Sequence, residues 1–293
     1  MSHKQLLKVA EINIGPVPDK AVQFDFEPVN CTWGDEPLVS VMDVGHSYDG
    51  GGDKGADFIF DCVDFSVREG TRTVILGENG SGKTSLLRII SGELSPTVGS
   101  VHFANGVTVA HFHQHSVDDL MYDLASPEDG QSDVVTALTL LSERYPAKTE
   151  QEVRGMLTRF GLSPKQVRNP KSCASAMFSC LTCMSPTQAD TNVRFLSGGE
   201  RCRLCMADLM LQSPHLLVID ELSNHLDVES VDALIYGLGK YNGTVVMASH
   251  DAHLIRSVGG ARGDAFVLFG GGLQRVEGGI DEYLKVFNQK YNR

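Results

Sequence analysis

The stretch Gly77–Thr84 reads GENGSGKT, a set of residue types that can hold phosphate groups. Its glycines allow successive backbone N–H groups to turn toward one anion. Lys83 adds a positive charge, and the Thr84 hydroxyl is a ligand for Mg²⁺. An apolar run, Thr73–Leu76, precedes the loop, and a helix-like run, Thr84–Ile90, follows it. This strand, loop and helix context predicts a phosphate-binding loop of the GxxxxGK[ST] type.

A second apolar run, His215–Ile219, ends in two adjacent carboxylates, Asp220 and Glu221. A short continuous apolar strand is typical of the buried centre of a parallel sheet, and ligands bind at the carboxyl ends of such strands. There Asp220 could hold Mg²⁺, and Glu221 could orient and activate an attacking water. For two acids alone, a strand ending in a solvated turn is the simpler interpretation; beside a phosphate loop it is the weaker one.

The order of the motifs along the chain resembles the ABC-type ATPase domain. Gly77–Thr84 matches its Walker A loop, Leu196–Glu200 (LSGGE) its signature, and Asp220–Glu221 its Walker B motif with the catalytic glutamate. Four single positions also match: Tyr48 the adenine-stacking aromatic, Gln114 the Q-loop glutamine, Asp227 the D-loop aspartate and His250 the switch histidine. The matching motifs lie between residues 38 and 290.

This resemblance implies ATP as the nucleotide and Mg²⁺ as its metal. The expected nucleotide-binding residues are Tyr48, Gly77, Glu78, Asn79, Gly80, Ser81, Gly82, Lys83, Thr84, Ser85 and Gln114. The expected metal ligands are Thr84, Gln114 and Asp220, and the expected catalytic residues are Glu221, His250 and Lys83. By resemblance, Ser197, Gly198, Gly199 and Glu200 act on the ATP of a second ATPase domain, with the D-loop aspartate Asp227 nearby. The chain is thus expected to need such a domain, as a second copy or as a missing first half.

A narrower resemblance is to ABC-F proteins, the soluble branch tied to translation. Asn224–Asp227 reads NHLD, as is typical of that branch, and Gly270–Gly279 is similar to the end of its eukaryotic general-control members. Residues 10–28 resemble the end of a linker between two ATPase domains. The chain therefore resembles the C-terminal ATP-binding domain of an ABC-F protein, with the ribosome or translation-control factors as implied partners. The alternatives are the motor subunit of an ABC transporter and a nucleotide-gated adaptor, and the intact Glu221 and His250 argue against the adaptor.

The charge and hydropathy of the chain limit its partners. No stretch approaches the roughly 18–20 apolar residues of a membrane span, and no signal peptide is recognisable at the first residues, so we expect a cytoplasmic protein. The net charge of −12 and the lack of any block of five or six basic residues leave open an acidic ATPase that makes no nucleic-acid contact of its own.

Hydrophobic periodicity predicts an α/β fold of the P-loop ABC type: a mostly parallel core sheet with helices, an antiparallel β subdomain and a helical subdomain at about residues 115–197. Residues 1–37 are expected to be a lead-in and 38–293 the ATPase domain. Val39–Val44 and Phe58–Val63 alternate like strands. Val101–Phe103 and Val107–Val109 flank Asn105-Gly106, which predicts a type I′ hairpin. After the signature, strands and helices alternate as in a parallel sheet.

Two groups of residues have the spacing of metal ligands. Cys180-x2-Cys183 and Cys202-x2-Cys205 fit a zinc site, although cysteines three apart on the helix after the signature favour packing. His111, His113 and His115 alternate along a strand-like run and could converge, although they bracket the expected Q-loop glutamine. An odd total of seven cysteines favours reduced thiols.

Overall fold

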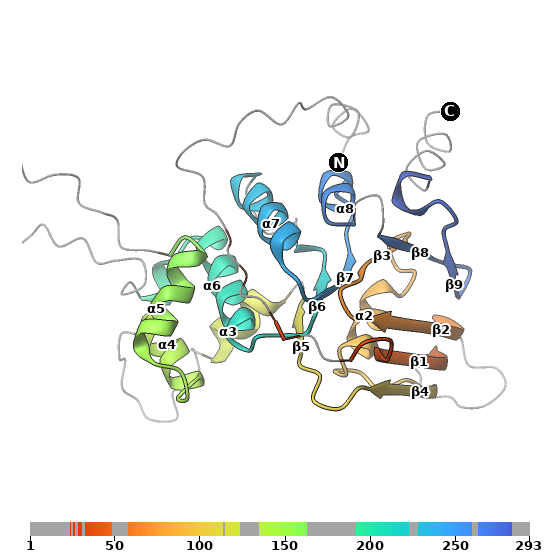
Figure 1. The fold of residues 1–293 in the computed structure, drawn as a ribbon, viewed down its shortest axis with the longest axis horizontal. Helices are drawn as coiled ribbons and strands as arrows, with labels where there is room; N and C mark the ends of the chain where they lie inside the picture. The colour runs from red at the N-terminus through yellow and green to blue at the C-terminus, as the bar shows by residue number, and fades with distance from the viewer. Residues whose placement is uncertain are drawn as a thin grey trace, which may run out of the picture.

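The computed structural model describes residues 24, 26, 29–30, 33–48, 58–113, 115–123, 135–162, 192–222, 228–259 and 263–282. Their strands form two sheets with helices between and beside them (Figure 1). The mixed α/β architecture, with a mainly parallel sheet, an antiparallel sheet and a group of helices, confirms the predicted fold class. None of the helices described is long and apolar enough to cross a membrane.

The larger sheet holds six strands in the order β5, β6, β7, β3, β8, β9, and only β9 runs antiparallel to its neighbour. The central strands are short and wholly or largely apolar, because both of their faces are covered. The strands are β5 (Val109–Phe112), β6 (Leu216–Asp220), β7 (Thr244–Ala248), β3 (Arg72–Gly77), β8 (Asp264–Phe269) and β9 (Gly272–Arg275).

The smaller sheet is antiparallel, in the order β2 (Phe60–Arg68), β1 (Pro37–His46), β4 (Val98–Phe103). Helix α2 (Lys83–Ile90) packs between the two sheets (Figure 1). Its apolar side chains share one core with Val41, Val63 and residues of β6 and β7. The start of α2 is therefore held rigidly next to the carboxyl ends of the parallel strands.

The predicted type I′ hairpin at Asn105-Gly106 is wrong. β4 pairs with β1 and β5 pairs with β6, so the two runs belong to different sheets. The turn between them is closed by the Val107 N–H, which donates to Ala104 O at 3.2 Å, as in a β-turn. Gly106 has a φ of 78°, but Asn105 is not among the residues with positive φ, and a type I′ turn needs both.

The helical part begins after β5 with α3 (Ser116–Asp123), α4 (Ala137–Arg144) and α5 (Glu150–Arg159), and continues through a 3₁₀ turn, η4 (Val193–Phe195), into α6 (Gly198–Leu211). The starts of α4, α5 and α6 each carry a capping box. Gly161 follows the end of α5 with a φ of 75°; its N–H donates to Thr158 O, and the Leu162 N–H donates to Leu157 O.

Helices α6, α7 (Val228–Lys240) and α8 (Ala252–Gly259) contribute to the core on the other face of the large sheet. In Figure 1 α4, α5 and α6 lie beyond β5, at the opposite end of the molecule from β9.

Three described residues of the predicted lead-in are buried in this core: Phe24, Phe26 and Val29. The Phe24 and Phe26 rings lie 5.0 and 5.7 Å from the Phe160 ring, and Phe26 also contacts Tyr241 at 5.5 Å. Phe160 follows α5 and Tyr241 follows α7. We call residues 24, 26 and 29 the N-terminal strap, because they join these two helix ends.

Candidate functional site

The predicted phosphate loop connects β3 to α2. Gly80 and Gly82 adopt φ angles of 81° and 99°, which favour glycine. A Cβ on Gly82 would come within 2.6 Å of the Ile59 side chain, so the loop has no room for a larger residue there. The Ser81 hydroxyl is buried and has no hydrogen-bond partner among the described residues. The loop is therefore a tight backbone turn at a helix start, a shape suited to an anion.

Lys83, the first residue of α2, points its ammonium back into this loop. Its Nζ donates to Gly77 O at 3.0 Å and to Glu78 O at 2.9 Å. Burial lowers the pKa of Lys83, whereas the carboxylates of Glu221 and Asp220 raise it. The ammonium thus lies within electrostatic reach of Asp220, the last residue of β6, and of Glu221, which follows it.

Asp220 ends β6 as a buried carboxyl group, with only 2% of its surface exposed. Burial raises its pKa, although a hydrogen bond with the Thr84 side chain acts in the opposite direction. Its Oδ1 is buried and has no hydrogen-bond partner in the described structure. An unpaired carboxylate oxygen beside a threonine hydroxyl provides the hard oxygen ligands that Mg²⁺ prefers, so these residues fit the implied metal.

Glu221 and His250 face each other across the ends of β6 and β7. Glu221 adopts a φ of 50°, which is uncommon for a residue with a side chain, and its N–H donates to Ala248 O at 3.0 Å. Its Oε1 lies 3.1 Å from His250 Nε2. Asp251 begins α8 by accepting hydrogen bonds from the N–H groups of His253 and Leu254, which fixes the loop that carries His250.

Tyr48 lies two residues beyond β1, and its hydroxyl is 2.8 Å from Ser85 Oγ on α2. Its side chain is mostly exposed, which leaves ring surface for stacking. Next to it lies His46, a buried histidine with neither ring nitrogen hydrogen-bonded in the described structure. Their ring centroids are 4.9 Å apart and nearly perpendicular. Burial and then the charge of Arg88 lower the pKa of His46.

The predicted signature forms the N-terminus of α6. Ser197 is the N-cap: its Oγ accepts from Glu200 N at 3.3 Å, and Glu200 Oε2 accepts from Ser197 N and Ser197 Oγ at 2.8 Å each. Ser197 and Gly198 are exposed. The signature therefore places the start of a capped helix on the molecular surface.

Strand register explains which predicted residues meet. Ala248 of β7 is paired with both Asp220 of β6 and Ile75 of β3, so three loops leave the sheet at one edge. Gly77–Ser85, Asp220, Glu221 and His250 gather there, with Tyr48 beside α2, while Ser197–Glu200 belongs to the helical layer. Gln114 and Asp227 lie outside the described residues.

The two possible metal groups of the sequence take other forms in the structure. Cys202 and Cys205 are buried in the core on α6, and Cys180 and Cys183 lie outside the described residues. The three histidines each face a different carboxylate: His111 faces Glu93, His113 faces Asp119 and His115 faces Asp118. Among the residues that the structure describes, no cluster of three or more such side chains could hold a metal ion.

One contact near the site was not predicted. The His111 ring on β5 lies against Glu93, which follows α2, with Nδ1 and Oε1 2.8 Å apart. No sequence signal pointed to Glu93, because the pairing depends on how α2 packs beneath β5.

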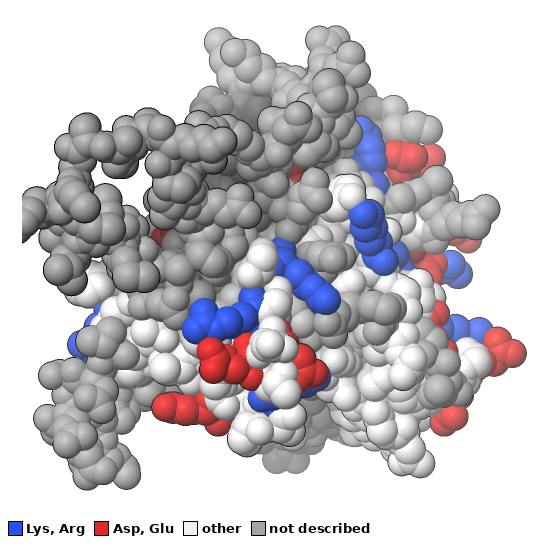
Figure 2. Space-filling view, turned by 60° about the vertical axis from the view of Figure 1, so that its left-hand side comes forward, with Lys and Arg blue, Asp and Glu red and all other residues white. Residues whose placement is uncertain are grey.

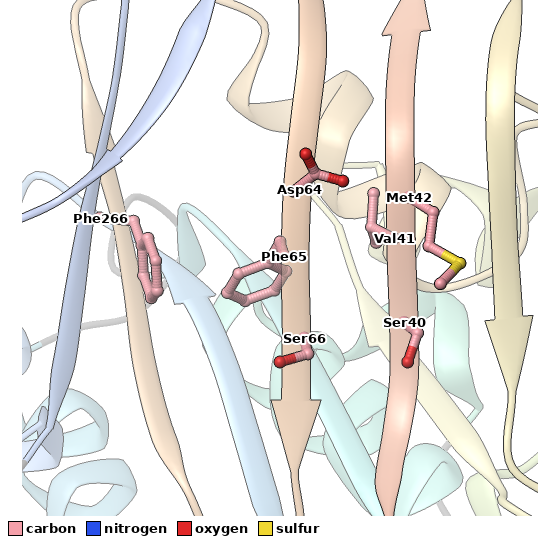
Figure 3. A pocket seen from close by; sticks show the side chains of 7 residues that line it. All are labelled: Ser40, Val41, Met42, Asp64, Phe65, Ser66 and Phe266. Atoms are coloured by element: carbon pink, nitrogen blue, oxygen red, sulfur yellow. The ribbon is translucent and has the colours of Figure 1, made fainter.

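A cavity of about 420 Å³ lies away from these residues (Figure 3). It is an open groove between β1, β2 and β8, where the Phe65 and Phe266 rings meet edge to face with centroids 5.0 Å apart. No residue of the phosphate loop lines it. Its lining residues are Ser40, Val41, Met42, Asp64, Phe65, Ser66 and Phe266.

Comparisons with known proteins agree with this geometry. The family model for the ABC transporter family matches residues 60–224. The mouse protein "ATP-binding cassette sub-family F member 2" is 33% identical over 243 residues, which are 83% of this chain and 32% of that protein. "Protein GCN20" of Saccharomyces cerevisiae is 30% identical over 282 residues, 96% of this chain and 32% of that protein. The chain spans about a third of the length of these curated relatives.

Solved structures show the same fold at low sequence identity. A dimeric bacterial ABC transporter cassette superimposes with a TM-score of 0.58 at 18% identity, covering 82% of this chain and all of that chain. A bacterial Atm1-family ABC exporter with ATP bound gives a TM-score of 0.59 at 19% identity, covering 96% of this chain and 44% of that one. The chain therefore belongs to the ABC transporter family of ATP-binding domains, and the two curated relatives named above are ABC-F members.

Proposed function

We propose that this chain binds and hydrolyses ATP as one of a pair of ATPase domains. Each ATP site is then composed of the phosphate loop of one domain and the signature of the other. The proposal rests on four groups that meet at one edge of the parallel sheet. The first two are the phosphate loop with Lys83 and the Asp220 carboxylate beside Thr84. The other two are Glu221 and His250, which lie 3.1 Å apart. Three loops far apart in sequence supply an anion cradle, a metal ligand pair and a base.

In this proposal the phosphate loop, Gly77–Thr84 and Ser85, holds the triphosphate through backbone N–H groups and the Lys83 ammonium. To reach the phosphates, Nζ exchanges its contacts with Gly77 O and Glu78 O for phosphate oxygens. Tyr48 stacks on the adenine. Thr84 and Asp220, with Gln114, hold Mg²⁺, which when bound neutralises charge on the phosphates.

Glu221 acts as the general base that takes a proton from the attacking water. Its contact with His250 places the carboxylate, and His250 then bonds the γ-phosphate. The strained backbone at Glu221 supports this role, because such conformations concentrate at functional sites.

The signature residues Ser197, Gly198, Gly199 and Glu200 serve the ATP of a second ATPase domain, with Asp227 at the same interface. An exposed helix start, with the positive end of its dipole at the surface, is suited to a γ-phosphate that arrives on another surface. A dimeric cassette among the structural relatives supports a domain pair. ATP then holds the two domains together, and hydrolysis releases them.

We further propose that the chain works in the cytoplasm, in translation or its control, with the ribosome or translation-control factors as partners. Support comes from the ABC-F relatives, among them Protein GCN20. Figure 2 shows basic and acidic side chains interspersed on the helical side of the described structure, so a contact with RNA would rely on individual basic residues. The second candidate is the motor subunit of an ABC transporter, which the family model and the exporter structure favour.

The test of ATP hydrolysis is the Glu221→Gln variant, which keeps the shape of the side chain and removes the base. We expect it to bind ATP with Mg²⁺ as tightly as the parent and to lose turnover by about 10²- to 10⁴-fold. Glu277→Gln, at an exposed turn, is the matched control and should keep the parent rate. Parent-like turnover in Glu221→Gln would overturn the assignment of the base.

The same variant tests the cellular role. In cell lysate with ATP and Mg²⁺, Glu221→Gln should sediment with ribosomes and lose that association when ATP is omitted. Sedimentation with membranes instead would favour the second candidate, the motor subunit of an ABC transporter. A monomer that stays in the supernatant under both conditions would contradict the proposed ribosomal partner for this chain.

A further inference from the structure

A buried histidine lies beside the metal side of the site and has no role in the function proposed above. The His111 side chain on β5 is only 2% exposed. Its Nδ1 lies 2.8 Å from Glu93 Oε1, and Glu93 Oε2 lies 3.7 Å from Arg88 Nε. The other ring nitrogen, Nε2, is buried and has no hydrogen-bond partner in the described structure. Leaving a buried polar atom unpaired costs folding free energy, so this nitrogen needs an explanation.

The contact with Glu93 determines what Nε2 can do. Burial raises the pKa of Glu93, yet the hydrogen bond with His111 and the surrounding positive charges, among them Arg88, together outweigh burial, so the pKa of Glu93 is lowered. A carboxylate that accepts from Nδ1–H fixes the orientation and tautomer of the ring. In the neutral ring, Nε2 then carries a lone pair and is a hydrogen-bond acceptor.

Strand register brings this acceptor close to Asp220. His111 is paired with Val218 in the parallel β5–β6 ladder, so His111, Val218 and Asp220 point to the same face of the sheet. Strand spacing and rise place the Cα atoms of His111 and Asp220 about 8 Å apart. Asp220 Oδ1 is the second buried polar atom without a partner here. Two side chains at that separation leave a gap that a water molecule can bridge.

We propose that His111 is a positioning residue for the metal that Asp220 and Thr84 hold. Its Nε2 accepts a hydrogen bond from a water bound to that metal, and Glu93 fixes the ring for this contact. The inference rests on the proposed function, because it assumes that Asp220 binds Mg²⁺. It assigns Glu93 and His111 to the surroundings of the metal, so neither is itself a ligand.

The test measures metal binding and not turnover. Mn²⁺, which replaces Mg²⁺ and is visible by electron paramagnetic resonance, is titrated into the full chain saturated with a non-hydrolysable ATP analogue. His111→Phe keeps a ring of similar size and removes both nitrogens. We expect about 10- to 100-fold weaker Mn²⁺ binding, the usual loss when an outer-shell partner is removed. Affinity for the analogue in EDTA should stay at the parent value.

Two further variants strengthen the test. His111→Gln, which restores a hydrogen-bonding group, should recover part of the Mn²⁺ affinity and carries the test if His111→Phe fails to fold. Glu93→Gln should weaken Mn²⁺ binding by about threefold to tenfold, because an amide is a poorer partner for Nδ1–H. The matched control is His215→Gln, since His215 lies at the other end of β6, where its Nδ1 accepts from Thr108 N–H.

The outcomes separate the two proposals. If the parent binds the analogue and Mn²⁺, and both His111 variants bind Mn²⁺ as tightly as the parent, the role of His111 is overturned while the proposed function stands. If the parent binds no Mn²⁺ with the analogue, the proposed metal site fails and the role of His111 falls with it. A loss of affinity equal to that of His215→Gln would also overturn the inference.

Discussion

Among single residues, Asp220 is the buried carboxyl group of the proposed metal site. Its carboxyl group is buried with one oxygen unpaired, and burial raises its pKa. Such a group favours its neutral form in the folded state, so the charged form that a metal requires is held at a cost to stability. The proposed metal role of Asp220 and the stability of the fold therefore conflict at this position, as function and stability do in many binding sites.

The first prediction concerns Asp220→Asn in the nucleotide-free protein. Because the folded pKa is raised, the contribution of Asp220 to stability is full below its unfolded pKa and is lost as pH rises through the folded pKa. We therefore expect the variant to have a higher Tm than the parent at pH 8, and a smaller difference at pH 5. Thermal unfolding at both values checks this. A lower Tm for the variant at pH 8 would contradict it.

Residue types predicted much of this site, but not all of it. Strand ends and a phosphate loop indicated where Lys83, Asp220 and Glu221 would gather, because parallel strands end at the same edge. The resemblance in motif order also placed Glu221 and His250 in one catalytic site, and their side chains lie 3.1 Å apart. The Glu93–His111 pair could not be found in this way. It depends on the position of an edge strand over α2, and no local spacing encodes that packing.

Among the elements, the caps are the clearest local signals. Thr149 and Ser197 each begin a helix with a glutamate three residues later, and both form capping boxes. The predicted hairpin at Asn105-Gly106 failed for the opposite reason. Val109–Phe112 finds its partner in β6, more than a hundred residues further on, and this long-range pairing overrides the local turn signal.

The second prediction compares these two caps. Thr149→Ala and Ser197→Ala should each lower the free energy of unfolding by about 1 kcal/mol, because each removes one N-cap. Only Ser197→Ala should also reduce ATP turnover, since we place Ser197 at the ATP of a second domain. Chemical denaturation and a steady-state ATPase assay measure the two effects. Equal turnover in both variants would argue against a role for Ser197 beyond capping.

At the scale of the whole molecule, the N-terminal strap ties two layers together. Val29 exchanges two hydrogen bonds with the Asn242 side chain, at 2.8 and 2.9 Å. A Cβ on Gly237 would come within 2.2 Å of the Phe26 ring, so α7 accepts the strap only because this position is a glycine. Composition gave no hint of this role, since an apolar periodicity is absent before residue 37.

The third prediction tests the strap. Phe26→Ala should lower the free energy of unfolding by about 3–5 kcal/mol, as expected when a buried phenylalanine is truncated. Gly237→Ala should also destabilise the fold, because the strap must shift to admit the methyl group. Gly239→Ala, on the same helix with open space around the glycine, is the matched control and should not destabilise it. Urea denaturation gives all three values, and an unchanged midpoint for Phe26→Ala would contradict the packing.

The N-terminal strap also couples the core of the molecule to the part of the chain before Phe24. Its phenylalanine rings contact Phe160 after α5 and Tyr241 after α7, so a force applied along the strap acts on the ends of both helices. Conversely, any swing of α5 away from α7 must slide Phe160 past two aromatic rings and move the strap with it. The same contacts thus couple the two movements in both directions. A change of the angle between α5 and α7 displaces the strap, and a displacement of the strap moves the ends of these helices.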